Sequence, residues 1–334
     1  MTLHPNDFPA SYGHGLLAAL ATASPAIVVT MADLWPAFAA TCGDAHRVLF
    51  VPGIERDDLE RLAAESAGAT RVIGLGGGTA IDAAKYVAWK TGAALYSVPT
   101  VASVDACFTA PAAVRDGGRV KYEGAVRPAG VLIDFDVLAT APAAMNRVGI
   151  GDVLSIHTGT WDWRLGAAAG KTQAFDEAIA TEAAAVLQRA MALRAGLAEA
   201  KPEALTALFE GFRWVGLTER TVGHCRFEEG SEHYFAYTIE FQTGKRPPHG
   251  HLVCMGVQLM SELQGNDPDG IAAYLSRAGI DVRPQALGFT WDEVEAALRG
   301  LAAHARAEGY AYSVLDEVPI DDAFLARCRA RLGA

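Results

Sequence analysis

Three side chains in well-separated segments could together bind a divalent metal ion. Asp152 lies in the segment GIGDVLS, His233 in GSEHYF and His249 in PPHGHLV. One carboxylate and two imidazoles leave open positions on a divalent ion, which Lewis-acid catalysis on a carbonyl or alcohol requires. The spacing alone does not bring these residues together, and His157 and His251 compete with them as ligands. An ordinary, partly buried histidine is the alternative at each position.

A run of three glycines, Gly76, Gly77 and Gly78, forms a candidate phosphate-binding loop. It follows the strand-like run 71–75 and precedes a helix-like segment, with Thr79 next in the chain. Glycines let the backbone approach a phosphate closely, and a helix N-terminus directs N–H groups and partial positive charge at an anion. The spacing fits neither the usual dinucleotide fingerprint nor the P-loop, so a simple glycine-rich turn is the alternative.

Polar residues after this loop, and after the next strand, could complete a site at the same edge. Asp82 and Lys85 are three residues apart, on one face of the helix that follows the loop. Thr100, Ser103 and Asp105 lie in VPTVASVDA, which begins at the end of a strand-like run. The hydroxyls could contact a cofactor, and Asp105 could bind substrate hydroxyls. A polar turn that caps a helix is the alternative.

Strand-like and helix-like segments alternate through about the first 150 residues. The expected strands are residues 26–30, 47–51, 72–75, 95–98 and 131–134, and the expected helices between them include 32–41, 57–67 and 80–91. This alternation predicts βαβ units in an α/β domain with a parallel sheet. Ligands of such sheets bind at the carboxyl ends of the strands, where the glycine loop is expected.

The second half of the chain has a different composition. Residues 152–334 are rich in Ala, Leu, Glu and Arg with helical periodicity, as in 172–197 and 291–308, and almost no β-branched runs remain. The sequence therefore predicts an α/β domain over residues 1–150 followed by an all-α domain over residues 151–334.

Charge and cysteine content restrict the possible partners and compartments. A net charge of −11 argues against nucleic acid or an anionic membrane as a partner. The five cysteines are widely spaced and form no CxxC pair, which favours reduced thiols in the cytoplasm. The N-terminal residues do not resemble a signal peptide, and the apolar stretches are too short to span a membrane. We expect a soluble cytoplasmic protein.

Six motifs, taken in order, resemble one enzyme superfamily. They read GGGTAIDAAKYVA, VPTVASVDACFTAPAAV, VLIDFDVL, GIGDVLSIHTGTWDWRL, GSEHYFAYTIE and HGHLVCMG. Glycerol dehydrogenases, dehydroquinate synthases and metal-dependent alcohol dehydrogenases carry similar motifs in this order. The pair Asp162-Trp163, the SEH motif followed by Glu240, and the pair Lys85-Tyr86 are most similar to the sn-glycerol-1-phosphate dehydrogenases.

The resemblance implies a dehydroquinate-synthase-like fold, with a Rossmann-like NAD(P)-binding domain and a helical metal- and substrate-binding domain. It implies NAD or NADP as cofactor, one divalent metal (zinc, nickel or iron), and interconversion of dihydroxyacetone phosphate and sn-glycerol 1-phosphate or a similar polyol phosphate. It also suggests a homodimer. The first strand ends at Thr30-Met31 without an acidic residue for the ribose, so both NAD and NADP remain open.

The resemblance also implies a role for each candidate residue. Those at the matching metal-ligand positions are Asp152, His233 and His249. Those implied in catalysis are Asp105, which matches a substrate-contacting aspartate, and Lys85. Those implied in cofactor binding are Gly76, Gly77, Gly78, Thr79, Asp82, Thr100, Ser103 and Thr109.

This chain departs from the family pattern at a few positions. Thr109 stands where serine is usual, His251 where an acidic residue is common, and Cys254 where glycine or alanine is usual. His251 could add a ligand or change the charge of the pocket. A substrate phosphate would need cationic partners, for which Arg220, Lys245 and Arg246 are candidates. The alternatives are a polyol dehydrogenase without a phosphate requirement, a dehydroquinate-synthase-type cyclase and a non-catalytic nucleotide-binding protein.

Overall fold

The computed structural model describes residues 7–333 except residue 45. The described residues form two compact units, which are considered separately below. The first contains the described part of 1–146 together with Phe212–Gly223, and the second contains Arg147–Gly211 together with the described part of 224–334. The long helix α11 (Pro202–Val222) therefore contributes residues to both units.

The first unit is built on a six-stranded parallel sheet in the order β1-β8-β5-β4-β2-β3. Its strands are β1 (Ala10–Gly13), β2 (Ile27–Thr30), β3 (Arg47–Phe50), β4 (Arg71–Gly76), β5 (Ala94–Pro99) and β8 (Gly130–Asp134). Its helices are α1 (Leu16–Ala23), α2 (Trp35–Cys42), α3 (Arg56–Glu65), α4 (Gly78–Thr91), the short η1 (Ala106–Phe108) and α5 (Phe135–Leu138). The parallel α/β sheet and its five expected strands are confirmed.

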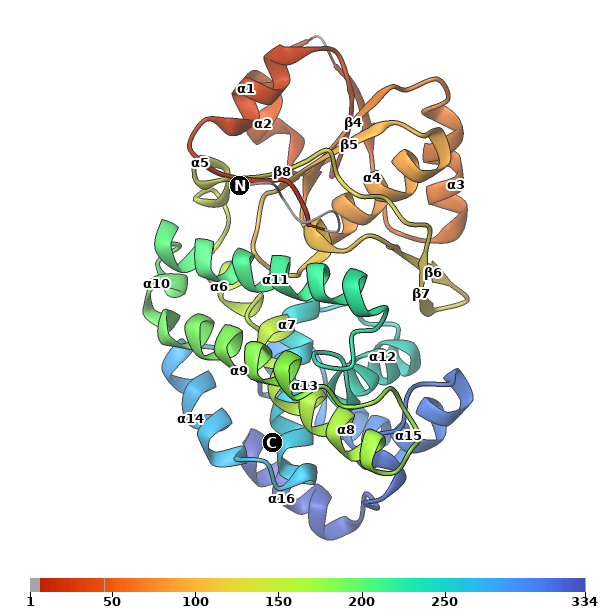
Figure 1. Ribbon diagram of the computed structural model, residues 1–334, viewed down its shortest axis with the longest axis vertical. Coiled ribbons are helices and arrows are strands. Elements are labelled where there is room, and N and C mark those ends of the chain that lie inside the picture. Colours follow the sequence, from red (N-terminus) through yellow and green to blue (C-terminus); the bar gives the residue numbers. More distant parts are fainter. Residues whose placement is uncertain (1–6, 45, 334) are drawn as a thin grey trace. The chain divides into compact units, whose positions relative to one another are not determined.

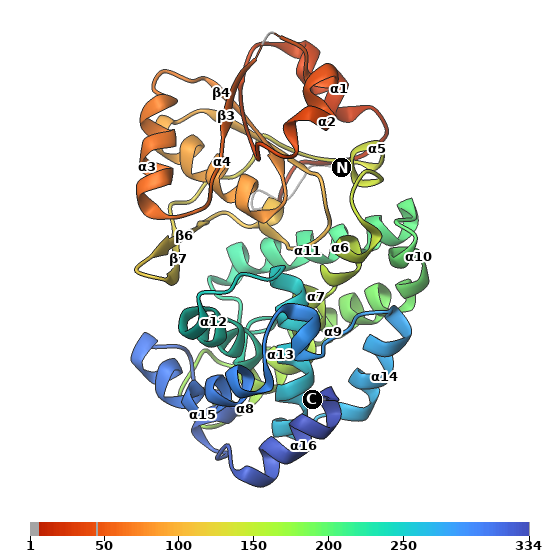
Figure 2. The same cartoon turned by 180° about the vertical axis from the view of Figure 1, so that it is seen from behind.

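Helices cover both faces of this sheet, as Figures 1 and 2 show. Alternate residues of β2 take part in different apolar cores: Val29 packs with Leu59 of α3 and Val87 of α4, whereas Val28 packs with helices α1 and α2. Because neighbouring strand residues point to opposite faces, a continuous apolar run is what a strand buried on both sides requires.

Two parts of the first unit were not expected from the sequence. β1 lies at one edge of the sheet, and an antiparallel hairpin joins β6 (Ala112–Asp116) to β7 (Arg119–Glu123). The turn between β6 and β7 is Gly117-Gly118, with φ of +60° and +79°. Positive φ at both positions is what a type I′ hairpin turn needs.

The second unit is helical, as expected for the C-terminal region. α6 (Ala143–Val148) crosses the division between the units. The helices of the second unit are α7 (Gly151–Leu154), α8 (Ile156–Ala168), α9 (Glu177–Ala192), α10 (Arg194–Ala198), the first part of α11, α12 (Ser231–Thr243), α13 (His249–Gln264), α14 (Pro268–Ala278), the short η2 (Pro284–Leu287), α15 (Trp291–Glu308), the short η3 (Val314–Asp316) and α16 (Asp322–Leu332). The periodicity over 291–308 matches α15, which begins with a capping box at Thr290 and Glu293.

The segment with helical periodicity over residues 172–197 starts later and is interrupted in the structure. The structure has two helices there, α9 and α10, and α9 begins only at Glu177. Asp176 fixes this start, because its carboxylate accepts the backbone N–H groups of Ala178 and Ile179. Within the part of the chain that the structure describes, no helix is both long and apolar enough to cross a membrane.

Candidate metal centre

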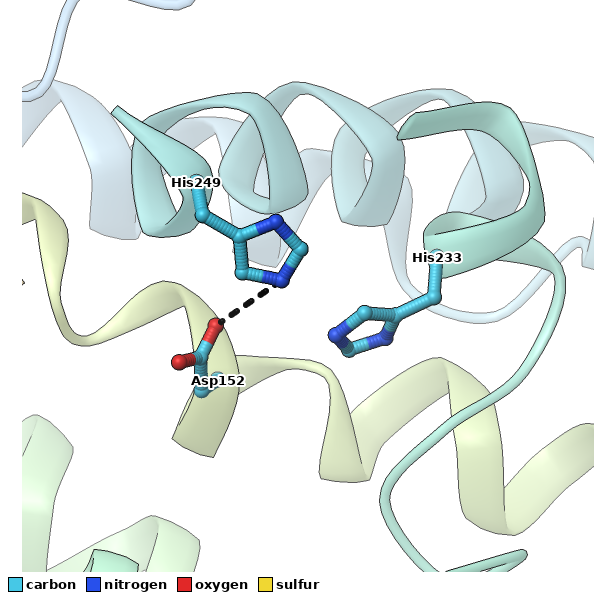
Figure 3. A group of neighbouring side chains, drawn as sticks. All are labelled: Asp152, His233 and His249. Carbon is cyan, nitrogen blue, oxygen red and sulfur yellow. Dashed lines mark ion pairs between the residues drawn. The ribbon is translucent and has the colours of Figure 1, made fainter. Parts of the chain in front are cut away.

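The second unit brings the three metal-ligand candidates together. Asp152 of α7, His233 of α12 and His249 of α13 each offer a donor atom, and these atoms all lie within 4.8 Å of one another. Figure 3 shows the three side chains pointing toward a common space from three different helices. Asp152 and His233 are buried, and His249 is partly exposed. A site with one accessible side can bind an ion and still admit another molecule.

A glycine allows α7 to approach α13 closely enough to pair two of these residues. A Cβ on Gly151 would lie only 2.1 Å from the backbone oxygen of Gly250, so no other residue fits here without displacing the backbone. Gly151 directly precedes Asp152, and Gly250 directly follows His249. The close helix contact therefore leaves the Asp152 Oδ1 and the His249 Nε2 3.8 Å apart.

A second glycine allows α12 and α13 to approach each other closely. A Cβ on Gly256 of α13 would lie 2.5 Å from the backbone oxygen of Glu232 on α12. Glu232 directly precedes His233 in the chain. The contact thus fixes the backbone from which the His233 ring projects.

Glu232 also orients the His233 ring through its side chain. The fully buried Glu232 carboxylate lies 3.0 Å from the His233 Nδ1, and the same oxygen accepts the backbone N–H of Gly230. A carboxylate on Nδ1 leaves Nε2 as the nitrogen available to a metal, an arrangement common behind metal-binding histidines. The ring is therefore held in one orientation without any ion.

Two carboxylates, Glu228 and Glu232, place negative charge close to His233. Burial alone would lower the pKa of this histidine, but Glu228 and Glu232 outweigh burial and raise its pKa to about 10. Carboxylates that hold a proton on this ring would equally favour a cation in its place. The donor types and the surrounding charge fit a divalent metal ion.

Asp162 anchors the start of α12 from outside that helix. Its Oδ2 accepts the backbone N–H of Ser231, the first residue of α12, and its Oδ1 accepts the N–H of Val314; both distances are 2.8 Å. Burial, with a contribution from the nearby Glu232, raises the pKa of Asp162 to about 6. Asp162 of the Asp-Trp pair therefore supports the start of the helix that carries His233.

His157 and His251, the other candidate ligands, contact backbone oxygens outside the candidate metal centre. The His157 Nε2 lies 2.7 Å from the backbone oxygen of Asn266, and the His251 Nε2 lies 2.8 Å from that of Asp281. Neither histidine belongs to the group of metal-capable side chains found among the described residues. Cys254 is buried on α13, and burial raises the pKa of its thiol.

The candidate cofactor residues lie in the first unit, at the carboxyl edge of the sheet. Gly76 ends β4 opposite Pro99 of β5, and the backbone N–H of Thr100 donates to the Gly76 oxygen. A Cβ on Gly77 would lie 3.8 Å from the hydroxyl of Ser103. Gly77, Gly78 and Thr79 are partly exposed at the start of α4. The glycine loop and the Thr100–Ser103 segment are thus neighbours, and their contact with a cofactor stays a prediction.

Buried Asp82 and Lys85 form a network with the partly exposed Thr109 in the same unit. The Lys85 Nζ lies 2.7 Å from the Asp82 Oδ1, 2.8 Å from the Thr109 hydroxyl and 2.7 Å from the Pro111 oxygen. Its side chain is only 2% exposed. Asp105 is partly exposed just before η1. The roles of these residues in catalysis and cofactor binding remain predictions.

The cationic candidates for a phosphate have protein partners. The Lys245 Nζ lies 2.7 Å from a Glu293 carboxylate oxygen, and Arg246 donates to the backbone oxygen of Glu240. Arg220, in the first unit, lies over the ring of Phe8.

The sequence interpretation missed two carboxylates beside the metal-ligand candidates. Glu232 could have been found, because a carboxylate next to a histidine ligand is a recurrent orienting group. Glu228, whose Oε1 lies 3.8 Å from the His233 Nε2, has no recognisable sequence signal, since it precedes α12 in an irregular segment.

Comparison with solved structures places this fold in a known class. A probable glycerol dehydrogenase from Sinorhizobium meliloti 1021 superposes with a TM-score of 0.73 over 98% of this chain and 97% of its own, at 23% identity. The glycerol dehydrogenase of Schizosaccharomyces pombe gives the same TM-score over 98% of this chain and 92% of its own, at 19% identity. Residues 41–142 also match the family described as iron-containing alcohol dehydrogenase. The chain thus has the fold of the metal-dependent alcohol dehydrogenases.

The sequence relatives identify a narrower family than the fold comparison does. The glycerol-1-phosphate dehydrogenase (NAD(P)+) of Aeropyrum pernix is 32% identical over 72% of this chain and 67% of its own length. The enzyme of the same name from Thermococcus kodakarensis is 31% identical over 72% of this chain and 68% of its own length. This chain belongs to the glycerol-1-phosphate dehydrogenase family.

Proposed function

We propose that this protein is a metal-dependent dehydrogenase that uses NAD or NADP to interconvert dihydroxyacetone phosphate and sn-glycerol 1-phosphate, or a similar small polyol phosphate. The convergence of Asp152, His233 and His249 carries the proposal, because it supplies a cation site where the family membership calls for one. Asp105 and Lys85 are the proposed catalytic residues of the first unit.

The chain's own residues set the conditions for this chemistry. When bound, a divalent ion would polarise the substrate oxygen, and the reduced nicotinamide would supply hydride. Asp152 would bring negative charge to the ion, while Glu232 holds the His233 ring so that Nε2 is free to coordinate. The glycine loop Gly76–Gly78, with Thr79, would hold the cofactor pyrophosphate at the start of α4.

A polyol dehydrogenase without a phosphate requirement is the second candidate. The observation that favours it is the state of the cationic side chains near the metal-ligand segments: Lys245 is paired with Glu293, and Arg246 donates to a backbone oxygen. A phosphate would have to compete with these partners.

A substrate panel separates these functions. Metal-depleted protein is reloaded with zinc, nickel or iron and given dihydroxyacetone phosphate or dihydroxyacetone with NADH or NADPH, and the absorbance of the reduced nicotinamide is followed. Preference for the phosphate supports the proposal, and preference for dihydroxyacetone supports the second candidate. A cyclase would leave the reduced cofactor unchanged over time, and a non-catalytic protein would bind cofactor without turnover.

The metal site itself is tested by His233→Ala. We expect this variant to lose its bound metal and its activity together, with the metal content measured by elemental analysis. A variant that keeps both would refute the assignment of the site.

We also propose that the protein acts in the cytoplasm as a homodimer. The resemblance to the family supports the homodimer, and the five free cysteines support a reducing compartment such as the cytoplasm. Light scattering of the purified protein would measure the number of subunits.

A further inference from the structure

Tyr237 is an aromatic side chain beside the candidate metal centre to which the function proposed above gives no role. It lies on α12 four residues after His233, so the two side chains share one face of that helix. Its ring centroid is 6.0 Å from that of His233 and 6.3 Å from that of His249. Both distances fall in the range of about 4.5–7 Å over which aromatic rings pack against one another. One tyrosine ring therefore borders two of the three candidate ligands.

The Tyr237 ring lies nearly parallel to the His249 ring. The planes of these two rings differ by 18°, whereas those of Tyr237 and His233 differ by 44°. The centroids of the two histidine rings are themselves 5.4 Å apart. The three side chains thus form a cluster of mutually packed rings, two of which carry a candidate donor nitrogen.

His249 is the candidate ligand whose orientation depends most on such packing. Its side chain is 29% exposed, against 5% for that of His233. It also projects from the first residue of α13, so no preceding turn of that helix limits its rotamers. A side chain that must settle into one rotamer to bind an ion loses conformational entropy. A ring packed against it beforehand reduces that loss.

Tyr237 is itself anchored by residues outside its own helix. Its hydroxyl donates to the Oε1 of Glu229, at 3.1 Å. Its ring centroid lies 5.8 Å from that of Tyr310, and the Tyr310 ring stacks on Tyr234 with centroids 4.7 Å apart. Glu229 precedes α12, and Tyr310 follows α15. An aromatic ring held from these two sides can in turn orient a neighbouring ring.

We propose that Tyr237 is a positioning residue of the metal site, which holds the His249 ring in the orientation that binds the ion. The inference rests on the metal site of the proposed function and adds to it a residue that acts through ring packing and not through coordination. Because the ring makes the contacts with both histidines, metal binding needs the aromatic ring of Tyr237 more than its hydroxyl.

Two substitutions separate the ring from the hydroxyl. Metal-depleted full-length wild-type protein, Tyr237→Phe and Tyr237→Leu each compete with a coloured chelator for Zn²⁺. We expect Zn²⁺ binding to be about tenfold weaker in Tyr237→Leu, which loses both ring contacts, and to stay within about threefold of the wild type in Tyr237→Phe. Tyr312→Leu is the matched control, because the Tyr312 hydroxyl contacts Glu317 at an exposed position. It should bind Zn²⁺ like the wild type.

Bound Co²⁺ supplies a measurement that a general loss of stability would not change. Its visible absorption depends on the geometry of its ligands. We expect the spectrum of Co²⁺-loaded Tyr237→Leu to differ from that of the wild type, because the His249 ring is no longer held in place. The spectra of Tyr237→Phe and Tyr312→Leu should match the wild type.

The outcomes separate this proposal from the metal site on which it rests. If the wild type binds Zn²⁺, His233→Ala does not, and Tyr237→Leu binds it like the wild type, then Tyr237 is not a positioning residue although the site stands. Equal losses in Tyr237→Leu and Tyr237→Phe would assign the effect to the hydroxyl and also overturn the proposal. So would weaker binding with an unchanged Co²⁺ spectrum. Failure of the wild type to bind any ion would overturn both the site and the proposal.

A further variant, Tyr310→Leu, covers the possibility that Tyr237→Leu does not fold. It removes the ring that packs against Tyr237 and leaves Tyr237 and both histidines in place. We expect it to bind Zn²⁺ about threefold more weakly than the wild type, with an unchanged circular dichroism spectrum of the metal-free protein. Wild-type affinity in this variant would contradict a role that depends on how the Tyr237 ring is held.

Discussion

His233 is held by its neighbours before any ion binds. Glu232 lies against its Nδ1 and Glu228 close to its Nε2, at 3.0 and 3.8 Å. Glu232 therefore fixes the orientation of the ring, and the negative charge of both carboxylates favours a cation beside it. A histidine whose orientation is fixed in advance loses little conformational freedom when it binds a metal.

Replacing Glu232 by Gln should weaken metal binding although Glu232 is not a proposed ligand. The amide keeps the shape of the side chain but removes the charge that supports His233. We expect a loss of metal affinity of about 10–100-fold, measured by chelator competition. Glu182→Gln, on the exposed face of α9, is the control and should bind metal like the wild type. Unchanged affinity in Glu232→Gln would show that the contact does not support the ligand.

At the scale of helices, the site depends on backbones that approach closely. α13 carries His249, and it receives α7 through Gly151 and α12 through Gly256. Each contact lies within one residue of a ligand or of the residue that orients a ligand. The geometry of the candidate metal centre is thus set by helix packing as much as by the three side chains themselves.

Gly256→Ala should therefore lower stability and weaken metal binding, although Gly256 is not itself a candidate ligand. The added Cβ would lie 2.5 Å from the Glu232 backbone oxygen, so α12 and α13 must separate. We expect a loss of about 1–3 kcal/mol in the free energy of unfolding, measured by denaturant titration, and weaker metal binding.

Gly300→Ala is the matched control for this helix-packing prediction. Gly300 lies inside α15, where a Cβ meets only the end of the Gln242 side chain, at 2.8 Å. Because that side chain can move, we expect stability to rise by about 0.5–1 kcal/mol, with metal affinity unchanged. Equal behaviour of the two alanine variants would contradict the importance of the α12–α13 contact.

Sequence reasoning succeeded where a pattern is local. Continuous apolar strands such as Ile27–Thr30 and the capped helix Trp291–Glu308 depend on neighbours in the chain, and both were found. The hairpin around Gly117-Gly118 had a local signal, a glycine pair between two runs of strand length, and could have been found. β1, with the sequence ASYG, has no β-branched residue and forms a strand because it pairs with β8.

Local sequence patterns did not predict the tertiary contacts. The spacing of Asp152, His233 and His249 did not predict that they converge, and only the family resemblance brought them together in the interpretation. Glu228 was missed because its importance comes from packing beside a residue of another segment. The helical periodicity over residues 172–197 did not indicate the break between α9 and α10 near Leu193.

At the scale of the whole molecule, the first unit is assembled from distant parts of the chain. Asp7 pairs with Arg213 of α11, with distances of 2.8 and 2.6 Å from the carboxylate oxygens to Nε and Nη2. A Cβ on Gly216 of α11 would lie only 1.9 Å from the backbone oxygen of Phe108. The second part of α11 is therefore packed into the first unit.

Asp7→Asn should destabilise the protein in a pH-dependent way. Burial would raise the pKa of Asp7, but the contacts with Arg213 and the Phe8 N–H outweigh burial and lower it. The ion pair thus adds stability above the unfolded pKa of about 4, and this stability is lost as pH falls through the lower folded pKa. We expect the variant to lose about 1–2 kcal/mol near neutral pH and the difference from the wild type to shrink below about pH 4.

Thermal unfolding at several pH values would measure this difference. Glu177→Gln is the control, because it removes the exposed pair between Arg164 and Glu177, and exposed pairs contribute little. A stability difference between Asp7→Asn and the wild type that does not change with pH would contradict the electrostatic explanation.

All three metal-ligand candidates belong to the second unit, whereas the glycine loop belongs to the first. The three candidate ligands therefore come together without the coenzyme, and we expect metal-depleted protein to bind an ion equally well with and without NAD or NADP.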